Sequence, residues 1–149
     1  MTPGSDDVVG GPPSIAFAMG FGLYLYFPLR LGHAAALEPD KSPQKALELI
    51  ARHRITIFVG VVSYYNMLGR LIEQTNADIS SLRHILTGGE PLSVEAERAW
   101  LATTGKPLGQ FIGTTEMLHI FATVSRPGAL IPSNTMGAPV PGYDIAVVD

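Results

Sequence analysis

Residues 113–116 combine glycine, hydroxyl and carboxylate groups in an order that suits a bound phosphate. Gly113 lets the backbone approach a ligand closely, Thr114 and Thr115 offer hydroxyl and N–H groups to phosphate oxygens, and Glu116 can hold Mg²⁺. The same residues also suit a strand-to-helix turn, in which a threonine caps the helix and the glutamate lies in its first turn. Taken alone, the four residues favour the turn, with the phosphate site as the alternative.

A second group of special residues is Gly88-Gly89-Glu90-Pro91, which also follows an apolar stretch. Two glycines allow a flat ring to lie against the backbone, although glycine pairs are common in turns after strands. Residues 103–107 resemble the end of a phosphate-binding loop, but they lack its glycine-rich first half and follow a predicted helix. We interpret residues 103–107 as a helix end with a lysine near its negative pole.

His119 lies three residues after Glu116, so both side chains could face one site if this segment is helical. Its neighbours Met117, Leu118 and Ile120 are apolar, which is more typical of a core or pocket histidine than of a metal ligand. No second histidine stands at metal-binding spacing. The sequence also has no GxSxG segment for a nucleophilic serine.

The composition excludes several classes of protein. The 149 residues carry a net charge of −3 and no run of Lys and Arg, which argues against binding to nucleic acid. The chain has no cysteine, which removes disulfide frameworks, zinc–thiolate sites and cysteine nucleophiles. Charged residues make up 15%, against about 25% in average domains, so few charges are available to cover a surface.

The apolar run at residues 15–29 could be mistaken for a targeting or membrane segment. It is shorter than the about 20 apolar residues that a membrane span needs. The residues before it include two aspartates and no Lys or Arg, unlike the basic start of a signal peptide. We predict a buried helix or helix–turn segment here, no membrane association, and a cytoplasmic protein.

Helical and strand patterns alternate along the rest of the chain. Predicted helices begin after the caps Ser42 and Ser93 and around Tyr64, and the first and last of them end near Arg54 and Gly105. Predicted strands cover residues 33–38, 55–62, 83–87, 107–112, 120–123 and 144–148. This alternation predicts an α/β fold, with a mainly parallel sheet and helices on both faces. We expect a loop or frayed terminus at 1–14, an α/β unit at 15–124, and a Pro/Gly-rich connection with a final strand at 125–149.

Four stretches resemble the acyl-adenylate-forming superfamily and, within it, the aryl-CoA ligases that act on benzoate and 2-aminobenzoate. They are PPSIAFAMGFGLYLYFPLRLG at 12–32, LTGGEPLS at 86–93, FIGTTEMLHIF at 111–121 and GAPVPGYDIAVVD at 137–149. The resemblance implies the fold of the large N-terminal domain of these enzymes. It also implies their two-step reaction, in which an aromatic acid and ATP form an acyl-adenylate and coenzyme A then displaces AMP.

The resemblance also assigns roles to individual positions. It implies an adenine pocket at Gly88, Gly89, Glu90 and Pro91. It also implies phosphate contacts at Thr114 and Thr115, and Glu116 as a ligand of Mg²⁺. The aromatic ring would lie among Ala18, Met19, Gly20, Ile112, Gly113 and His119. Three places depart from common members of the family. Ile112 replaces a frequent aromatic residue, as in the aryl branch, and Met19 stands where benzoate ligases tend to have an aromatic residue. Val61-Val62-Ser63 stands where relatives commonly have Val-Pro-Thr.

The resemblance places the family's phosphate loop before residue 1, and its ribose-binding aspartate and catalytic-lysine domain beyond residue 149. We therefore expect a fragment that is inactive alone and that self-associates through surfaces a longer protein would cover. A non-catalytic binding module that kept the fold is the alternative. An unrelated flavodoxin-like domain is a third interpretation.

Overall fold

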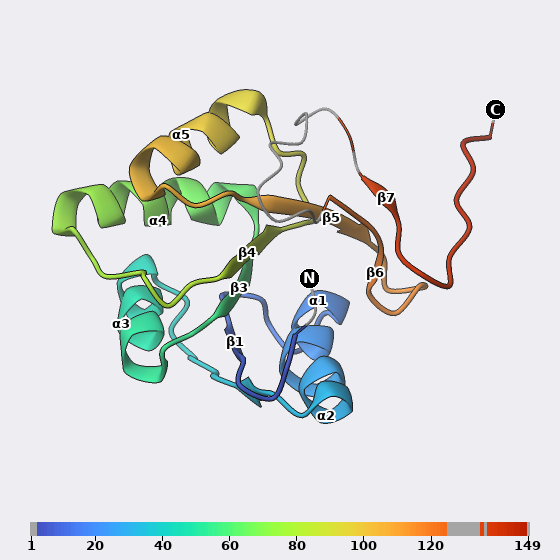
Figure 1. The fold of residues 1–149 in the computed structure, drawn as a ribbon, viewed down its shortest axis with the longest axis horizontal. Helices are drawn as coiled ribbons and strands as arrows, with labels where there is room; N and C mark the ends of the chain where they lie inside the picture. The colour runs from blue at the N-terminus through green and yellow to red at the C-terminus, as the bar shows by residue number, and fades with distance from the viewer. Residues whose placement is uncertain (1–2, 125–134, 136, 149) are drawn as a thin grey trace.

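The computed structural model describes residues 3–124, 135 and 137–148, and its centre is a seven-stranded sheet (Figure 1). The strand order is β2-β1-β3-β4-β5-β6-β7. The strands are β1 (Val8–Gly10), β2 (Ala34–Ala35), β3 (Ile57–Gly60), β4 (His84–Thr87), β5 (Gly109–Gly113), β6 (Ile120–Val124) and β7 (Ala138–Pro139). Pairing is parallel from β2 to β5 and antiparallel from β5 to β7. The predicted α/β fold with a mainly parallel sheet is confirmed.

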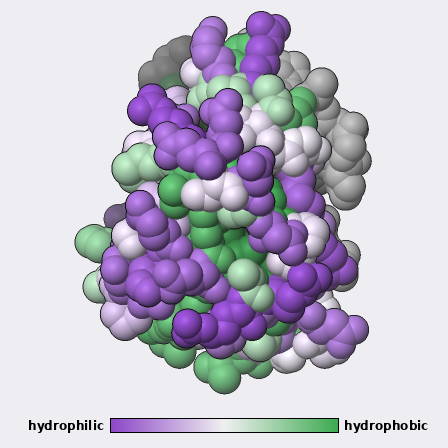
Figure 2. All heavy atoms as spheres, turned by 90° about the vertical axis from the view of Figure 1, so that its left-hand side faces the viewer, coloured by the Kyte–Doolittle hydropathy of each residue, from purple (hydrophilic) through white to green (hydrophobic). Residues whose placement is uncertain are grey.

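Three amphipathic helices cover one face of the sheet: α3 (Pro43–His53), α4 (Val62–Thr75) and α5 (Val94–Thr104). The side chains of Ser42 and Ser93 accept backbone N–H bonds at the starts of α3 and α5, as predicted. Left-handed residues end both helices, Arg54 after α3 and Gly105 after α5. Their apolar faces pack with Phe58 and Ile85 from the sheet in the larger core cluster. Hydrophilic side chains cover much of the outer face on this side of the molecule (Figure 2).

The other face of the sheet is covered by one continuous helical segment with three parts. These are α1 (Ala18–Phe21), the π-helical turn η1 (Gly22–Tyr26) and α2 (Phe27–Leu31). Leu23 and Tyr24 of η1 pack on sheet side chains such as Ile57 and Phe111 in a second core cluster. Residues 15–29 were predicted as a buried helix, and the helix is present. However, Phe17 is 72% exposed and Leu29 is 83% exposed, so its outer face is uncovered.

The two ends of the chain differ from the prediction. Residues 8–10, within the predicted N-terminal loop, form β1, which pairs with both β2 and β3 inside the sheet. The strand expected at 144–148 is not formed: no strand among the described residues pairs with this segment, and Val147 is fully exposed. Most of the expected Pro/Gly-rich loop at 125–142 lies outside the described residues.

A polar cluster holds the start of β1 in the sheet. It lies where the parallel strands begin, at the end of the sheet opposite the one from which the chain continues into α1 and α4. The side chain of Asp7 is 1% exposed. Its carboxylate accepts hydrogen bonds from Thr56 Oγ1 at 2.5 Å and from the N–H of Gly4 at 2.9 Å, and it pairs with the Arg83 guanidinium. The cluster therefore ties together the starts of three neighbouring parallel strands. Within the described part of the chain, no helix is long and apolar enough to span a membrane.

Candidate functional site

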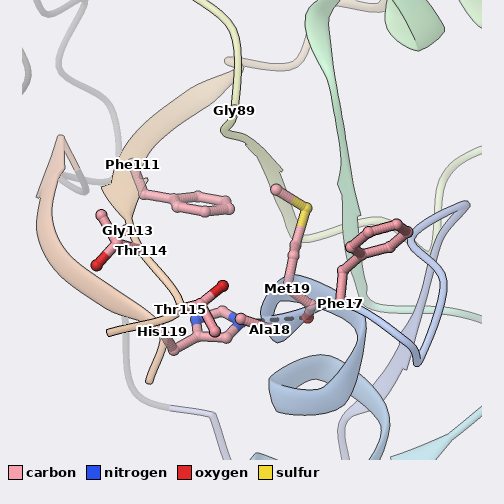
Figure 3. A pocket seen from close by; sticks show the side chains of 9 residues that line it. All are labelled: Phe17, Ala18, Met19, Gly89, Phe111, Gly113, Thr114, Thr115 and His119. Atoms are coloured by element: carbon pink, nitrogen blue, oxygen red, sulfur yellow. Dashed lines mark hydrogen bonds between the residues drawn. The ribbon is translucent and has the colours of Figure 1, made fainter. Parts of the chain in front are cut away.

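A cavity of about 180 Å³ lies where β4 and β5 end, beside the start of α1. In an open α/β sheet this edge is the usual place for a ligand. Figure 3 shows Met19, Phe111 and His119 converging on the cavity from α1, β5 and the turn before β6, with Gly89 beyond them. Its lining residues are Phe17, Ala18, Met19, Gly89, Phe111, Gly113, Thr114, Thr115 and His119.

His119 forms one wall of the cavity and links two parts of the chain that are far apart in sequence. Its Nε2 lies 3.2 Å from the carbonyl oxygen of Met19. A carbonyl only accepts, so Nε2 carries the proton and donates this bond. The imidazole also stacks on Phe111 and meets Phe27 edge-on, with ring centroids 6.1 and 4.8 Å apart. Burial lowers the pKa of His119, while the bond to Met19 opposes this shift. The imidazole of His119 is therefore uncharged at neutral pH.

Gly22 leaves space for the imidazole ring of His119. A Cβ at this position would lie 2.1 Å from Cδ2 of His119 and 2.5 Å from Nε2. Gly22 opens the π-helical turn, and such turns are frequent where a helix builds a site. The Cδ2–Nε2 edge of the ring thus packs against the helix backbone. This contact explains why the sequence has glycine between the apolar residues Phe21 and Leu23.

Residues 114–119 form the turn of a β-hairpin between β5 and β6, rather than the start of a helix. The N–H of Thr114 bonds the carbonyl of His119, and the N–H of Met117 bonds Oγ1 of Thr114. Glu116 and His119 therefore do not share a helical face. Glu116 is exposed in the turn, while His119 points inward. The strand-to-helix turn that the four residues favoured is wrong, because β6 returns directly alongside β5.

In the segment after β4, one residue lines the cavity and its neighbours pack around it. Gly89 lines the cavity with φ +80°, a conformation that favours glycine. A Cβ on Gly88 would lie 2.4 Å from the Phe111 ring, so Gly88 lets that ring reach its place. The carboxylate of Glu90 accepts bonds from the N–H and the Oγ of Ser63, at 2.8 and 2.9 Å. Glu90 thereby puts negative charge at the start of α4, which the helix dipole favours.

Comparison with known proteins shows the family of this chain. A family model described as AMP-binding enzyme matches residues 1–149, the whole chain. The chain belongs to the AMP-binding enzyme family. The resemblance to the adenylate-forming enzymes that the sequence motifs indicated is therefore confirmed, and the relatives below place it near the aryl-CoA ligases.

Among the relatives of this AMP-binding chain is the benzoate–CoA ligase of Thauera aromatica, 35% identical over 144 residues. The alignment covers 96% of this chain and 27% of the relative. The crystal structure of the anthranilate CoA ligase AuaEII with anthranoyl-AMP superposes with a TM-score of 0.89, at 32% identity over 98% of this chain and 28% of that one. A benzoate CoA ligase from Burkholderia xenovorans gives a TM-score of 0.81, at 30% identity over 95% of this chain and 29% of that one. The chain thus spans about a quarter of the length of these proteins.

The AMP-binding chain brings seven of the thirteen predicted site residues to the cavity: Ala18, Met19, Gly89, Gly113, Thr114, Thr115 and His119. The other six do not line it: Gly20, Gly88, Glu90, Pro91, Ile112 and Glu116. Gly20 is buried, and its α-carbon packs so closely on the carbonyl of Ser14 that a Cβ would lie 2.0 Å from its oxygen. Pro91 is exposed beyond Glu90.

Sequence reasoning missed Phe17 and Phe111, which both line the cavity. Successive side chains of a strand point to opposite faces. Phe111 lies in the core cluster under η1, so its neighbour Ile112 faces the other way. The alternation of side chains along β5 was the signal that could have identified Phe111. A site for a ring under the helical segment must be lined from the sheet face on which Phe111 lies, and Ile112 lies on the other face.

The described residues by themselves do not enclose a metal ion. They hold no group of three or more His, Cys, Asp or Glu side chains that could ligate one. Mg²⁺ commonly uses only one or two carboxylates and completes its shell with waters and substrate phosphates. The exposed carboxylate of Glu116, next to the Thr114 and Thr115 hydroxyls, fits that partial role.

Proposed function

We propose that this chain forms the part of an aryl-CoA ligase that binds the aromatic acid and faces the nucleotide. In the proposed reaction, a carboxylate oxygen of the acid attacks the α-phosphorus of ATP and pyrophosphate leaves. The thiol sulfur of coenzyme A then attacks the carbonyl carbon of the acyl-adenylate, and AMP leaves. The observation that carries the proposal is the convergence of Met19, Phe111 and His119 on one cavity beside Thr114 and Thr115.

The cavity has two chemically different parts, which suit the two ends of an aromatic acid. Phe17, Ala18, Met19 and Phe111 supply apolar surface for a ring, and the volume of about 180 Å³ exceeds the roughly 150 Å³ of an apolar cavity that binds benzene. Thr114 and Thr115 supply hydroxyl groups on the side of Phe111 and His119, across from Phe17 and Met19 (Figure 3). A ring held on the apolar side directs its carboxylate toward the threonines, where a nucleotide phosphate would have to lie.

The chain's own residues act by binding and orientation. The neutral imidazole of His119 closes the ring site without a charge that would draw in water. Thr114 and Thr115 can donate hydrogen bonds to phosphate oxygens, and the Glu116 carboxylate would help to hold Mg²⁺. When bound, Mg²⁺ would neutralise phosphate charge during the transfer. Holding the carboxylate and the α-phosphate in line lowers the activation free energy, because the reactants need little further orientation to reach the transition state.

Binding of aromatic acids tests the proposal. We expect benzoate and 2-aminobenzoate to bind the chain in a calorimetric titration, and Ala18→Trp to weaken binding at least about ten-fold by filling the cavity. Ala51→Trp, which adds the same ring at an exposed position of α3, is the matched control and should bind as the parent does. Absence of binding, or equal binding by both variants, would contradict the proposed site.

The same preparation should show no exchange of pyrophosphate into ATP in the presence of these acids. None of the residues that line the cavity is Lys or Arg, so the described site lacks a cation to balance the phosphate charge. Acid-dependent exchange by the 149-residue chain would show that the adenylation machinery is more complete than we propose.

We also propose that the isolated chain self-associates through the outer face of α1, η1 and α2. Residues 15–31 carry a single charged side chain, Arg30, and large apolar side chains such as Phe17 and Leu29 are exposed. Contiguous apolar surface of this kind favours association. Sedimentation velocity is expected to show dimers or larger species at about 100 µM, and Leu29→Glu should reduce them. Met67→Glu, at an exposed apolar position of α4, should not. A monomer throughout this range would refute the association.

A further inference from the structure

The start of α4 lies beside the loop at residues 88–92, and one carboxylate joins the two. Helix α4 begins after Val61, whose side chain makes no capping hydrogen bond. An apolar side chain cannot cap a helix, so the first N–H groups of α4 need an acceptor from elsewhere in the chain. Glu90, 27 positions after Ser63, provides it. Its Oε2 accepts the N–H of Ser63 at 2.8 Å, and its Oε1 accepts the Oγ hydroxyl at 2.9 Å.

The loop at residues 88–92 is held at three points. Its sequence is GGEPL, so Glu90 has the one side chain in it that can accept a hydrogen bond. The N–H of Gly88 bonds the carbonyl of Gly60 at 3.3 Å, which holds the loop where it leaves β4. Leu92 is buried in the core and holds the other end. Between these ends the two glycines leave the backbone much freedom, and the carboxylate bonds to α4 restrict it.

Gly89 connects this loop to the cavity of Figure 3, which it lines with φ +80°. A Cβ at Gly89 would lie 3.7 Å from Cε of Met19 and 3.8 Å from Cγ1 of Val61. Gly89 therefore packs close to a cavity residue of α1 and to the residue before α4. Figure 3 shows the Met19 side chain extending toward Gly89. A displacement of the loop would change the cavity wall at this contact.

We propose that Ser63 and Glu90 form a positioning pair for the aromatic-acid site, because their hydrogen bonds hold Gly89 against Met19. The inference rests on the proposed function, since it concerns the cavity proposed for the acid. Neither Ser63 nor Glu90 lines that cavity, and both oxygens of the carboxylate bind Ser63. Glu90 thus acts through the position of the loop and not by touching the acid.

The affinity for benzoate measures this positioning. Glu90→Ala is expected to weaken benzoate binding to the 149-residue chain at least about five-fold, the factor that corresponds to the loss of a typical helix cap. The affinity falls because only the chains with the loop in place bind the acid well. Glu90→Gln should bind within about two-fold of the parent, since its amide oxygen can accept the N–H of Ser63 and its NH₂ group can donate to the hydroxyl. Glu95→Ala removes a carboxylate from the first turn of α5 and is the matched control, which should bind as the parent does.

NMR signals of the ligand-free chain test the position of the loop directly. Glu90→Ala should shift the signals of the Met19 methyl and the Gly89 amide, whereas Glu95→Ala should leave both at their parent positions. These signals need no ligand, so they test the pair even if the parent chain does not bind benzoate. Absence of benzoate binding by the parent would contradict the proposed function, and the ligand-free signals would still decide whether the pair holds the loop.

Two results would overturn the positioning pair. One is a folded Glu90→Ala chain in which the Met19 and Gly89 signals stay at their parent positions. The other is a folded Glu90→Ala chain that binds benzoate as tightly as the parent, because Glu90 would then only cap α4. Ser63→Ala removes the hydroxyl and keeps the N–H bond to Glu90, so it replaces Glu90→Ala if that variant does not fold. It should shift the same two signals, and unchanged signals in Ser63→Ala would likewise refute the proposal.

Discussion

Gly22→Ala is expected to weaken the binding of aromatic acids at least about ten-fold while leaving the chain folded. The added Cβ would lie 2.1 Å from Cδ2 of His119, well inside contact distance, so the imidazole must leave its place. It then loses its bond to the Met19 carbonyl and its stacking on Phe111, and one wall of the cavity in Figure 3 opens. Alanine otherwise favours a helix over glycine, by about 1 kcal/mol, so the loss of binding should not arise from unfolding.

The position of the histidine can be followed directly. Burial holds the pKa of His119 below its ordinary value, so release of the ring into water should raise that pKa toward normal in an NMR titration. Gly69→Ala is the matched control. It also changes a helical glycine, in α4, but its Cβ would meet Trp100 at an ordinary distance of 3.7 Å. If Gly22→Ala leaves both the histidine pKa and the acid affinity unchanged, the packing argument for Gly22 is wrong.

The helices α3, α4 and α5 and the strands between them could be predicted from the sequence because their signals are local. Ser42 and Ser93 cap helices, Gly105 ends one, and apolar residues repeat at helical spacing. The strand β1 carries no such signal. Its three residues lie among glycines, prolines and two aspartates, and only pairing with β2 and β3 makes them a strand. The reverse holds at 144–148, where apolar residues suggest a strand but no strand in the described part of the chain pairs with them.

The site shows the same division between local and non-local information. The motifs at 88–91 and 113–116 indicated which loops meet, because both follow strands that end at one edge of the sheet. They did not indicate that β6 returns antiparallel and makes residues 114–119 a hairpin. That return, and not helical spacing, turns His119 inward to meet Met19, a hundred positions earlier in the chain. Whether Phe111 or Ile112 lines the cavity likewise depends on which face of the sheet η1 covers.

Asp7→Asn is expected to lower the free energy of unfolding by about 2 kcal/mol at pH 7, although residue 7 does not line the cavity of Figure 3. Removing the charge from one side of an ion pair leaves the other side uncompensated, and a fully buried pair would cost more. Arg83 is 56% exposed and can turn to water, which limits the loss. The single amide oxygen of asparagine can still accept from Thr56, but the NH₂ group then faces the N–H of Gly4 and that bond is lost, so β1 should stay in the sheet with a weaker attachment.

The effect should disappear in acid. Burial alone would raise the pKa of Asp7, but the hydrogen bonds from Thr56, Gly4 and Arg83, with the charge of Arg83, lower it to about 2 from an ordinary value of 3.8. The ionised carboxylate therefore stabilises the fold fully above about pH 4, and this stabilisation is lost as the pH falls toward 2. Urea unfolding of the parent and of Asp7→Asn should give curves that converge over that range.

Glu48→Gln is the matched control for the removal of one carboxylate charge. Glu48 pairs with Lys45 at 2.6 Å, but both side chains are about half exposed on α3, and such pairs contribute less than about 1 kcal/mol. We expect its free energy of unfolding to stay within about 0.5 kcal/mol of the parent at pH 7. Equal effects of the two substitutions would mean that the buried cluster around Asp7 does no more for β1 than a surface ion pair does for α3. A cluster that joins the starts of three strands should do more, because its loss weakens the attachment of a strand that pairs on both sides and leads into α1, which carries part of the cavity.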